Sequence, residues 1–308
     1  MFEGILGIKK PIFGLDIGHE TLKIIELKGK GRSAKLLGAA EVPIDPKMLS
    51  KNGVHHKDKL ANYIKQALQV SRPHKITARI VSSALPESLV FTKTLNLPQM
   101  SIAEINKNIS HKAREFFPIP IEETYLDWHV TGENTAKKQL EILVVATSKV
   151  LVNGLTETIN SLGLELMGLE NKPISVSRAL IAPWDKNSYL ICDIGAEISS
   201  LTCYSNQMIR FTSTINTGGD MIKQDFNTSI ETLGTEILNL IKFYQNRAGK
   251  VGIFGKIILC GGGSNISGVT ESLAKLTKID TIVGLPWINL KVYDPRFATA
   301  IGLAMKEI

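Results

Sequence analysis

The stretch that decides the fold is IFGLDIG at residues 12–18, which returns as YLICDIG at residues 189–195. Each copy is an apolar strand that ends in an acidic turn. Glycine is needed where a backbone bends sharply or approaches a ligand closely. If the two copies face each other across a pseudo-twofold axis, Asp16 and Asp193 point into one space. Such a carboxylate pair suits a hydrated divalent cation, and the flanking N–H groups suit phosphate oxygens.

A third glycine-rich turn, GGGS at residues 261–264, follows a strand-like stretch at residues 256–260 and precedes a helical pattern at residues 269–278. A single Asp-Ile-Gly is a common strand end and carries little weight. Two copies in matching contexts, together with a glycine-rich turn from strand to helix, predict a nucleotide cleft.

Further motifs occur at characteristic spacings. They are LPE at 85–87, LPQM at 97–100, FPIPIEE at 117–123, GGD at 218–220 and ATAIGLA at 298–304. With them the chain resembles the superfamily of actin, Hsp70 and the sugar kinases, whose two phosphate turns and adenosine turn come in this order. It resembles more specifically the PilM family of type IV pilus assembly, cytoplasmic actin-like proteins of the inner-membrane platform that are similar to the division protein FtsA.

This resemblance implies an α/β chain with the actin-like ATPase fold. It would have two duplicated lobes, an inserted subdomain of the FtsA and PilM type, and a reduced outer subdomain in the second lobe. The implied cofactors are ATP and Mg²⁺, with Asp16 and Asp193 holding the ion through water. The cofactor-binding residues we predict are Asp16, Gly18, Thr21, Lys23, Asp193, Gly195, Ala196, Gly218, Gly219, Gly261, Gly262, Gly263 and Ser264.

The expected domain boundaries follow from the resemblance and from local patterns. We expect the first lobe at 1–84 and 169–188, the insert at 85–168, the second lobe at 189–294, and a C-terminal helix at 295–308 returning to the first lobe.

The insert should contain a helix, a hairpin and a second helix. Ser101 and Glu104 form a capping box that starts the first helix, with Ile102, Ile105 and Ile109 on its buried face. Residues 221–247 read as one long helix, which leaves little room for an outer subdomain before the third turn.

The partner implied by the resemblance is the short cytoplasmic tail of the membrane protein PilN. An extended tail would lie in a groove between the first lobe and the insert, where backbone pairing gives affinity and side-chain pockets give specificity. The candidate wall residues, each of which also suits interior packing, are Leu85, Pro86, Leu97, Phe116, Phe117, Pro118 and Ile121. No apolar run approaches the roughly 18 residues of a membrane span. We therefore expect a cytoplasmic protein at the inner face of the membrane, peripheral to it through this partner.

Two observations leave open whether the cleft binds a nucleotide. His19 and Glu20 stand where the family prefers small hydroxyl residues, and a carboxylate there repels a triphosphate unless it points away or meets the cation. Lys23 suits a phosphate contact or an ordinary solvated strand lysine equally well. The sequence is therefore compatible with firm nucleotide binding, weak binding or no binding in this cleft.

Charge and chemistry separate the remaining function classes. The net charge of +7 is spread along the chain without a basic helix carrying interleaved aromatics, so we expect no nucleic-acid partner. No residue stands out as a general base, and we expect nucleotide binding with little or no turnover. The alternatives are an ATP-dependent kinase or ATPase, and a filament-forming membrane tether like FtsA. A tether needs an amphipathic terminal helix, whereas the Ala-rich residues 298–304 suit a packed one.

Overall fold

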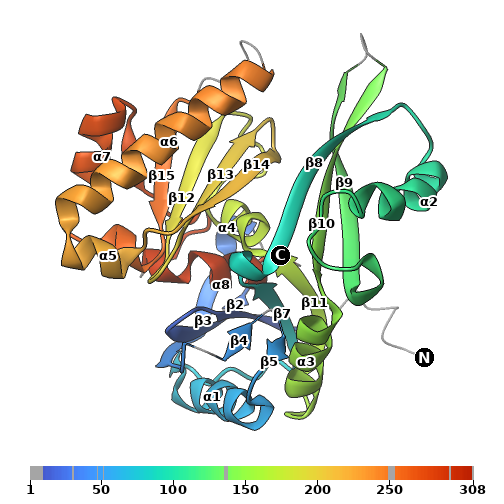
Figure 1. Ribbon diagram of the computed structural model, residues 1–308. Helices are drawn as coiled ribbons and strands as arrows, with labels where there is room; N and C mark the ends of the chain where they lie inside the picture. Colours follow the sequence, from blue (N-terminus) through green and yellow to red (C-terminus); the bar gives the residue numbers. More distant parts are fainter. Residues whose placement is uncertain are drawn as a thin grey trace.

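The computed structural model describes residues 10–29, 31–46, 48–50, 52–134, 138–248, 254–290 and 293–306. Three sheets organise the chain: one in each of two α/β lobes, and a small sheet that stands beside them (Figure 1). The outermost residues of the expected first and last segments, 1–9 and 307–308, lie outside the described residues.

The first lobe is built on a six-stranded sheet with the order β11-β7-β1-β2-β3-β6. β1 runs antiparallel to β2 and parallel to β7. Its strands are β1 (Ile12–Ile17), β2 (Thr21–Lys28), β3 (Lys35–Pro43), β6 (Arg72–Pro73), β7 (Ile80–Leu85) and β11 (Glu165–Asn171). A short pair, β4 (Leu49–Ser50) with β5 (Gly53–Val54), lies beside it.

The second lobe repeats this arrangement. Its five-stranded sheet has the order β14-β13-β12-β15-β16, and β12 runs antiparallel to β13 and parallel to β15. Its strands are β12 (Tyr189–Ile194), β13 (Ser199–Ser205), β14 (Met208–Ile215), β15 (Lys256–Cys260) and β16 (Thr281–Val283). The two copies of the repeated sequence are therefore the equivalent strands β1 and β12.

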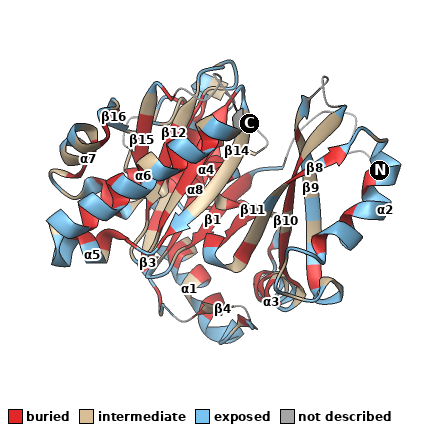
Figure 2. Cartoon of the chain, turned by 45° about the horizontal axis from the view of Figure 1, so that its top comes forward, coloured by how far each residue is buried: buried red, intermediate tan, exposed pale blue. Residues whose placement is uncertain are grey.

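Helices cover both lobes. α1 (Lys57–Val70) and α3 (Lys149–Asn160) pack on the outer face of the first sheet. α5 (Gly219–Gln224), α6 (Phe226–Ala248) and α7 (Val269–Thr277) pack on the outer face of the second, and α6 turns its buried side toward the strands (Figure 2). α4 (Lys172–Leu180) and α8 (Ala298–Ala304) share one core with the inner faces of both sheets.

The C-terminal helix α8 packs tightly on the first lobe. A Cβ on Gly14 of β1 would lie 2.0 Å from the carbonyl oxygen of Ala300, and a Cβ on Gly302 would lie 1.7 Å from that of Ser175 in α4. Because glycine has no Cβ, α8 can approach the backbone of β1 closely at Gly14 and the backbone of α4 closely at Gly302. The contact fixes the C-terminal segment at the base of the two lobes.

The prediction of one continuous helix at 221–247 is wrong. Asp225 has an extended backbone, with φ −140° and ψ 91°, and separates α5 from α6. Its Oδ1 accepts a hydrogen bond of 3.1 Å from the N–H of Thr228, so the side chain caps the first turn of α6. Residues 218–248 are all described, and only Asp225 separates the two helices, which leaves no separate subdomain there.

The third sheet has the order β8-β10-β9 and carries α2 (Ile102–Ala113). Its strands are β8 (Val90–Pro98), β9 (Thr124–Asn134) and β10 (Gln139–Ser148). The Ser101 and Glu104 capping box is present, and Ile105 and Ile109 are buried as predicted. Ile102 is 69% exposed, so its predicted burial is wrong: the core of this sheet starts one turn later, at Ile105.

The second helix expected in the insert, α3, packs in the core of the first lobe and not in the core of the third sheet. Its apolar side chains Leu151, Leu155 and Ile159 are fully buried in the core of the first lobe, where α3 lies beside α1 (Figure 1). No helix within the described residues is long and apolar enough to cross a membrane.

Candidate functional site

A cavity of about 780 Å³ opens where the two lobes meet. The ends of β1 and β12, the third glycine-rich turn and the first residue of α4 all face it. Of the predicted cofactor residues, the cavity is lined by Asp16, Gly18, Thr21, Lys23, Asp193, Gly195, Ala196, Gly261 and Gly262. Residues that lie far apart in the sequence thus meet in one cleft.

The two phosphate-type turns have the same geometry. The N–H of Gly18 donates to the carbonyl of Thr21 at 2.9 Å, and the N–H of Gly195 donates to that of Ile198 at 3.0 Å. In both turns a Cβ on the glycine would lie 2.8 Å from that same carbonyl oxygen. Glycine is therefore required at each position by the close approach across the turn.

The remaining predicted residues support the turns from behind. The N–H of Gly219 donates to the carbonyl of Gly195 at 2.7 Å, and a Cβ on Gly218 would lie 2.2 Å from the carbonyl oxygen of Ala196. A Cβ on Gly263 would lie 2.1 Å from Cγ2 of Ile194. The Ser264 hydroxyl donates to the carbonyl of Gly261 at 2.7 Å.

The third glycine-rich turn contacts the second phosphate-type turn through Gly261. This residue has φ 80°, in the left-handed region that favours glycine, and a Cβ there would lie 2.3 Å from Oδ1 of Asp193. The Asp193 carboxylate therefore packs directly against the backbone of Gly261.

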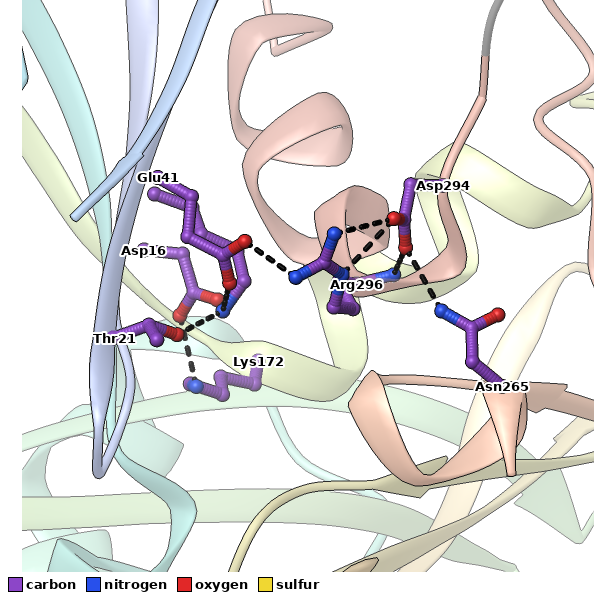
Figure 3. A network of polar contacts seen from close by, with 8 residues as sticks. Asp16, Thr21, Glu41, Lys172, Asn265, Asp294 and Arg296 are labelled. Carbon is purple, nitrogen blue, oxygen red and sulfur yellow. Dashed lines mark hydrogen bonds and ion pairs between the residues drawn. The ribbon is translucent and has the colours of Figure 1, made fainter. Parts of the chain in front are cut away.

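Lys172, the first residue of α4, is a functional candidate that the sequence did not reveal. Its Nζ lies 2.8 Å from Oδ1 of Asp16, and the two side chains, 18% and 6% exposed, point toward each other (Figure 3). Burial lowers the pKa of the Lys172 ammonium, but the Asp16 and Asp193 carboxylates outweigh burial and hold that pKa above its ordinary value. Burial raises the pKa of Asp193, which Asp16 raises further and Lys172 opposes.

Lys23 is not a solvated strand lysine. Its side chain is 10% exposed, and Nζ donates to the hydroxyl of Thr21 at 2.5 Å and lies 3.5 Å from Oε1 of Glu41. β2 carries it on the face toward the cleft, opposite Asp16 in the β1–β2 register. Lys23 thus supplies a second cation at the floor of the cavity.

A polar chain crosses from the first lobe to the third turn through Arg296. Its guanidinium lies 2.6 Å from Oε2 of Glu41 on β3 and 2.7 Å from Oδ2 of Asp294 (Figure 3). Asp294 also accepts a 3.2 Å hydrogen bond from the Asn265 amide, next to the glycine-rich turn. Arg296 therefore links the first lobe to the third turn along the wall of the cavity.

Two further contacts join the lobes across the cleft. The Ser200 hydroxyl on β13 donates to Glu87, which follows β7, and Nδ1 of His19 lies 3.3 Å from Oε2 of Glu197. Burial raises the pKa of Glu87. The hydrogen bond from Ser200 and the Lys172 ammonium oppose this rise, and the Asp193 carboxylate adds to it, which together leave the pKa at about 7. Glu87 belongs to the LPE motif, but its role as a bridge between the lobes was not predicted.

The residues present do not fit the expected magnesium site. Asp16 is already paired with the Lys172 ammonium, whose charge also acts on Asp193. A divalent cation about 4 Å from an ammonium is repelled by about 8 kcal/mol at an effective dielectric constant near 20. Among the described residues, no group of at least three His, Cys, Asp or Glu could hold a metal.

The predicted partner-binding residues divide into three sets. Leu85 is buried in the core of the first lobe, and Leu97 in the core of the third sheet, so neither forms a surface wall. Pro86 lines the inter-lobe cavity. The others lie between α2 and β9: Phe116 and Pro118 are exposed, and Phe117 and Ile121 are half-buried.

Solved structures share this architecture. A PilM–PilN type IV pilus biogenesis complex matches with a TM-score of 0.76 and 23% identity, covering 96% of this chain and 98% of that one. EutJ of Carboxydothermus hydrogenoformans matches at 0.59 and 14%, covering 97% and 90%. MreB 5 of Spiroplasma citri bound to AMPPNP matches at 0.51 and 12%, covering 97% and 96%. These likenesses confirm the predicted actin-like fold.

Sequence comparison identifies the family. The cell division protein FtsA of Neisseria meningitidis serogroup B (strain ATCC BAA-335 / MC58) is 21% identical over 229 residues, which are 56% of this chain and 55% of FtsA. The chain thus spans about half the length of this curated relative. A family model described as type IV pilus assembly protein PilM matches residues 14–232, most of the chain and both phosphate-type turns. The chain belongs to the PilM family of type IV pilus assembly proteins.

Proposed function

We propose that this chain is an adaptor of type IV pilus assembly that binds ATP between its two glycine turns and holds the cytoplasmic tail of a PilN-like membrane protein. The observation that carries the nucleotide site is the matched pair of turns around Gly18 and Gly195, which open onto one cavity. Backbone N–H groups at such turns bind phosphate oxygens. The related fold of MreB 5 was solved with AMPPNP bound.

The expected Mg²⁺ is left out of this proposal because Lys172 already neutralises Asp16. The adenosine would lie beside the third turn, where Asn265, Ile266 and Arg296 line the cavity. With α6 following α5 after one residue, no outer subdomain closes over it. A shallow adenosine site of this kind favours modest affinity.

For the partner, we propose a docking surface at the junction of the third sheet with the first lobe. It comprises Phe116, Pro118, Ile121, Tyr125 and Val150, and we call it the junction surface. Tyr125 is 47% exposed and Val150 is 59% exposed, and the Tyr125 hydroxyl donates to the Asn153 side chain on α3 at 3.1 Å. The surface therefore spans the insert and the first lobe, where an extended apolar tail can lie.

The PilM–PilN complex supports this partner, since its architecture covers nearly the whole chain. We propose that the tail brings the protein to the inner face of the cytoplasmic membrane. We also propose the division into a first lobe, an insert and a second lobe, with α3 counted in the first lobe because its core is there.

The nucleotide proposal is tested by titrating ATP calorimetrically into the wild-type chain and an Ala196→Glu variant. Ala196 lines the cleft, so the added carboxylate should weaken binding about tenfold or more through repulsion of the phosphates. Ala103→Glu, at an exposed position of α2, is the matched control and should bind as the wild type does. Equal binding by all three proteins would place the nucleotide outside this cleft.

A second candidate function is nucleotide hydrolysis, favoured by Glu87. This carboxyl lines the cleft and has a pKa of about 7, where a general base works well. Phosphate release that is abolished by Glu87→Gln, with ATP binding retained, would establish turnover. Release that is unchanged would show that Glu87 is only a contact between the lobes.

A further inference from the structure

A lysine stands where the fold would be expected to hold a metal ion. Lys172 follows Asn171, the N-cap of α4, so its side chain enters the cleft from the first turn of the helix. Its Nζ approaches Asp16 at 2.8 Å (Figure 3), and its charge acts on Asp193 and Glu87 as well. One ammonium thus faces the carboxyl groups of β1, β12 and the LPE segment.

The other charged groups that line the cavity are mostly paired. Lys23 and Arg296 hold Glu41, His19 faces Glu197, and Lys223 lies 3.5 Å from Asp220. Glu20 lines the cavity mouth beside His19. Of these cations, Lys223 is largely exposed at the rim, and Arg296 lies toward the third turn. Lys172 and Lys23 are therefore the mostly buried cations at the cleft floor, next to Gly18.

We propose that Lys172 takes the place of the divalent cation: its ammonium lies between the Asp16 carboxylate and the phosphates of a nucleotide, with Lys23 as a second cation, so that the phosphates bind without metal. The inference rests on the proposed nucleotide site. Lysine binds phosphate as a point charge, and an ammonium fixed by carboxylates is already oriented when the ligand arrives.

The direct test needs no variant. ATP is titrated calorimetrically into the wild-type chain in buffer with excess Mg²⁺ and in metal-free buffer with EDTA. The dissociation constants should agree within about threefold, because Lys172 supplies the positive charge in both. Binding that weakens more than about tenfold in EDTA would overturn the inference and leave the nucleotide site intact. Absence of binding in both buffers would overturn both.

A second test asks whether Mg²⁺ can replace the Lys172 ammonium. Lys172→Gln removes the ammonium, so ATP binding in EDTA should weaken about tenfold or more and recover with Mg²⁺. Mg²⁺ alone, without nucleotide, should raise the melting temperature of Lys172→Gln and leave that of the wild type unchanged, since a ligand stabilises only a protein that binds it.

Lys256→Gln is the matched control. Lys256 pairs with Asp280 at 3.1 Å, at the end of β15 away from the cleft, and its loss should alter neither ATP binding nor the response to Mg²⁺. If Mg²⁺ shifts the melting temperature of the wild type as much as that of Lys172→Gln, a metal and Lys172 coexist and the inference is wrong. This thermal readout is independent of nucleotide binding.

Discussion

Glu87 of the first lobe accepts a hydrogen bond from Ser200 of the second, so this carboxyl is one of the groups that join the two lobes at the cleft. Burial raises its pKa from 4.5 to about 7. The folded state therefore binds this proton more tightly than the unfolded state does. The stabilisation is complete below about pH 4.5 and is lost as the pH rises through about 7.

The first prediction follows from this linkage. Glu87 should lower the free energy of unfolding by about 3 kcal/mol between these two pH values, since each pKa unit is worth about 1.4 kcal/mol. Glu87→Gln mimics the protonated form and should flatten the pH dependence of the melting temperature. Glu231→Gln, at an exposed position of α6, should keep the wild-type profile. A Glu87→Gln profile as steep as that of the wild type contradicts the assignment.

The second prediction concerns the contact between α4 and α8. Gly302→Ala should destabilise the protein by about 1–3 kcal/mol or more, although alanine is the better helix former, because the new Cβ meets the Ser175 carbonyl. Gly255→Ala is the control, since no heavy atom lies within 4 Å of the added methyl group. Chemical denaturation measures both changes. Equal stability of the two variants would mean that α8 does not pack against α4 as described.

The third prediction separates the exposed from the buried partner candidates. Phe116→Ser should weaken binding of a peptide copying the tail of the PilN-like protein and leave the melting temperature unchanged, because Phe116 is 45% exposed. Met221→Ser, at a 47% exposed position of α5, should leave both unchanged. Leu97→Ala should destabilise the fold by about 2–5 kcal/mol through the cavity it creates. Normal peptide binding by Phe116→Ser would remove Phe116 from the junction surface.

The fourth prediction concerns the start of α2. The Ser101 hydroxyl accepts the N–H of Glu104, and the Glu104 carboxylate accepts the N–H of Ser101. Ser101→Ala should cost about 1 kcal/mol, while Ser110→Ala, at an exposed position in the last turn of α2, should cost nothing or slightly stabilise. Hydrogen exchange of the first turn of α2 reports the difference. A larger loss for Ser110→Ala would contradict the cap.

The sequence predicted the repeated turns because each depends on local features, an apolar strand and a required glycine at Gly18 and Gly195. The capping box at Ser101 was predicted because it too is a local pattern. The exposure of Ile102 and the packing of α3 in the first lobe were not predicted, because the spacing of apolar residues along one helix does not identify the core against which the helix packs.

Lys172 was not predicted as a site residue, because its partner Asp16 is distant along the chain and its neighbours form no phosphate motif. Asn171 and Pro173, an N-cap residue and a proline in the first turn, did mark a helix start after a strand. That signal could have placed Lys172 at the cleft. Lys23 was ambiguous because β2 is buried on both faces, so alternation did not assign its side chain to solvent.

The central claim is a nucleotide site between the two glycine turns, and a crystal structure of the chain grown with AMPPNP tests it most directly. The account predicts the triphosphate between the turns of Gly18 and Gly195, with the Lys172 ammonium beside it. A structure with AMPPNP bound elsewhere, or with the Lys172–Asp16 pair undisturbed and no nucleotide in the cleft, would contradict it.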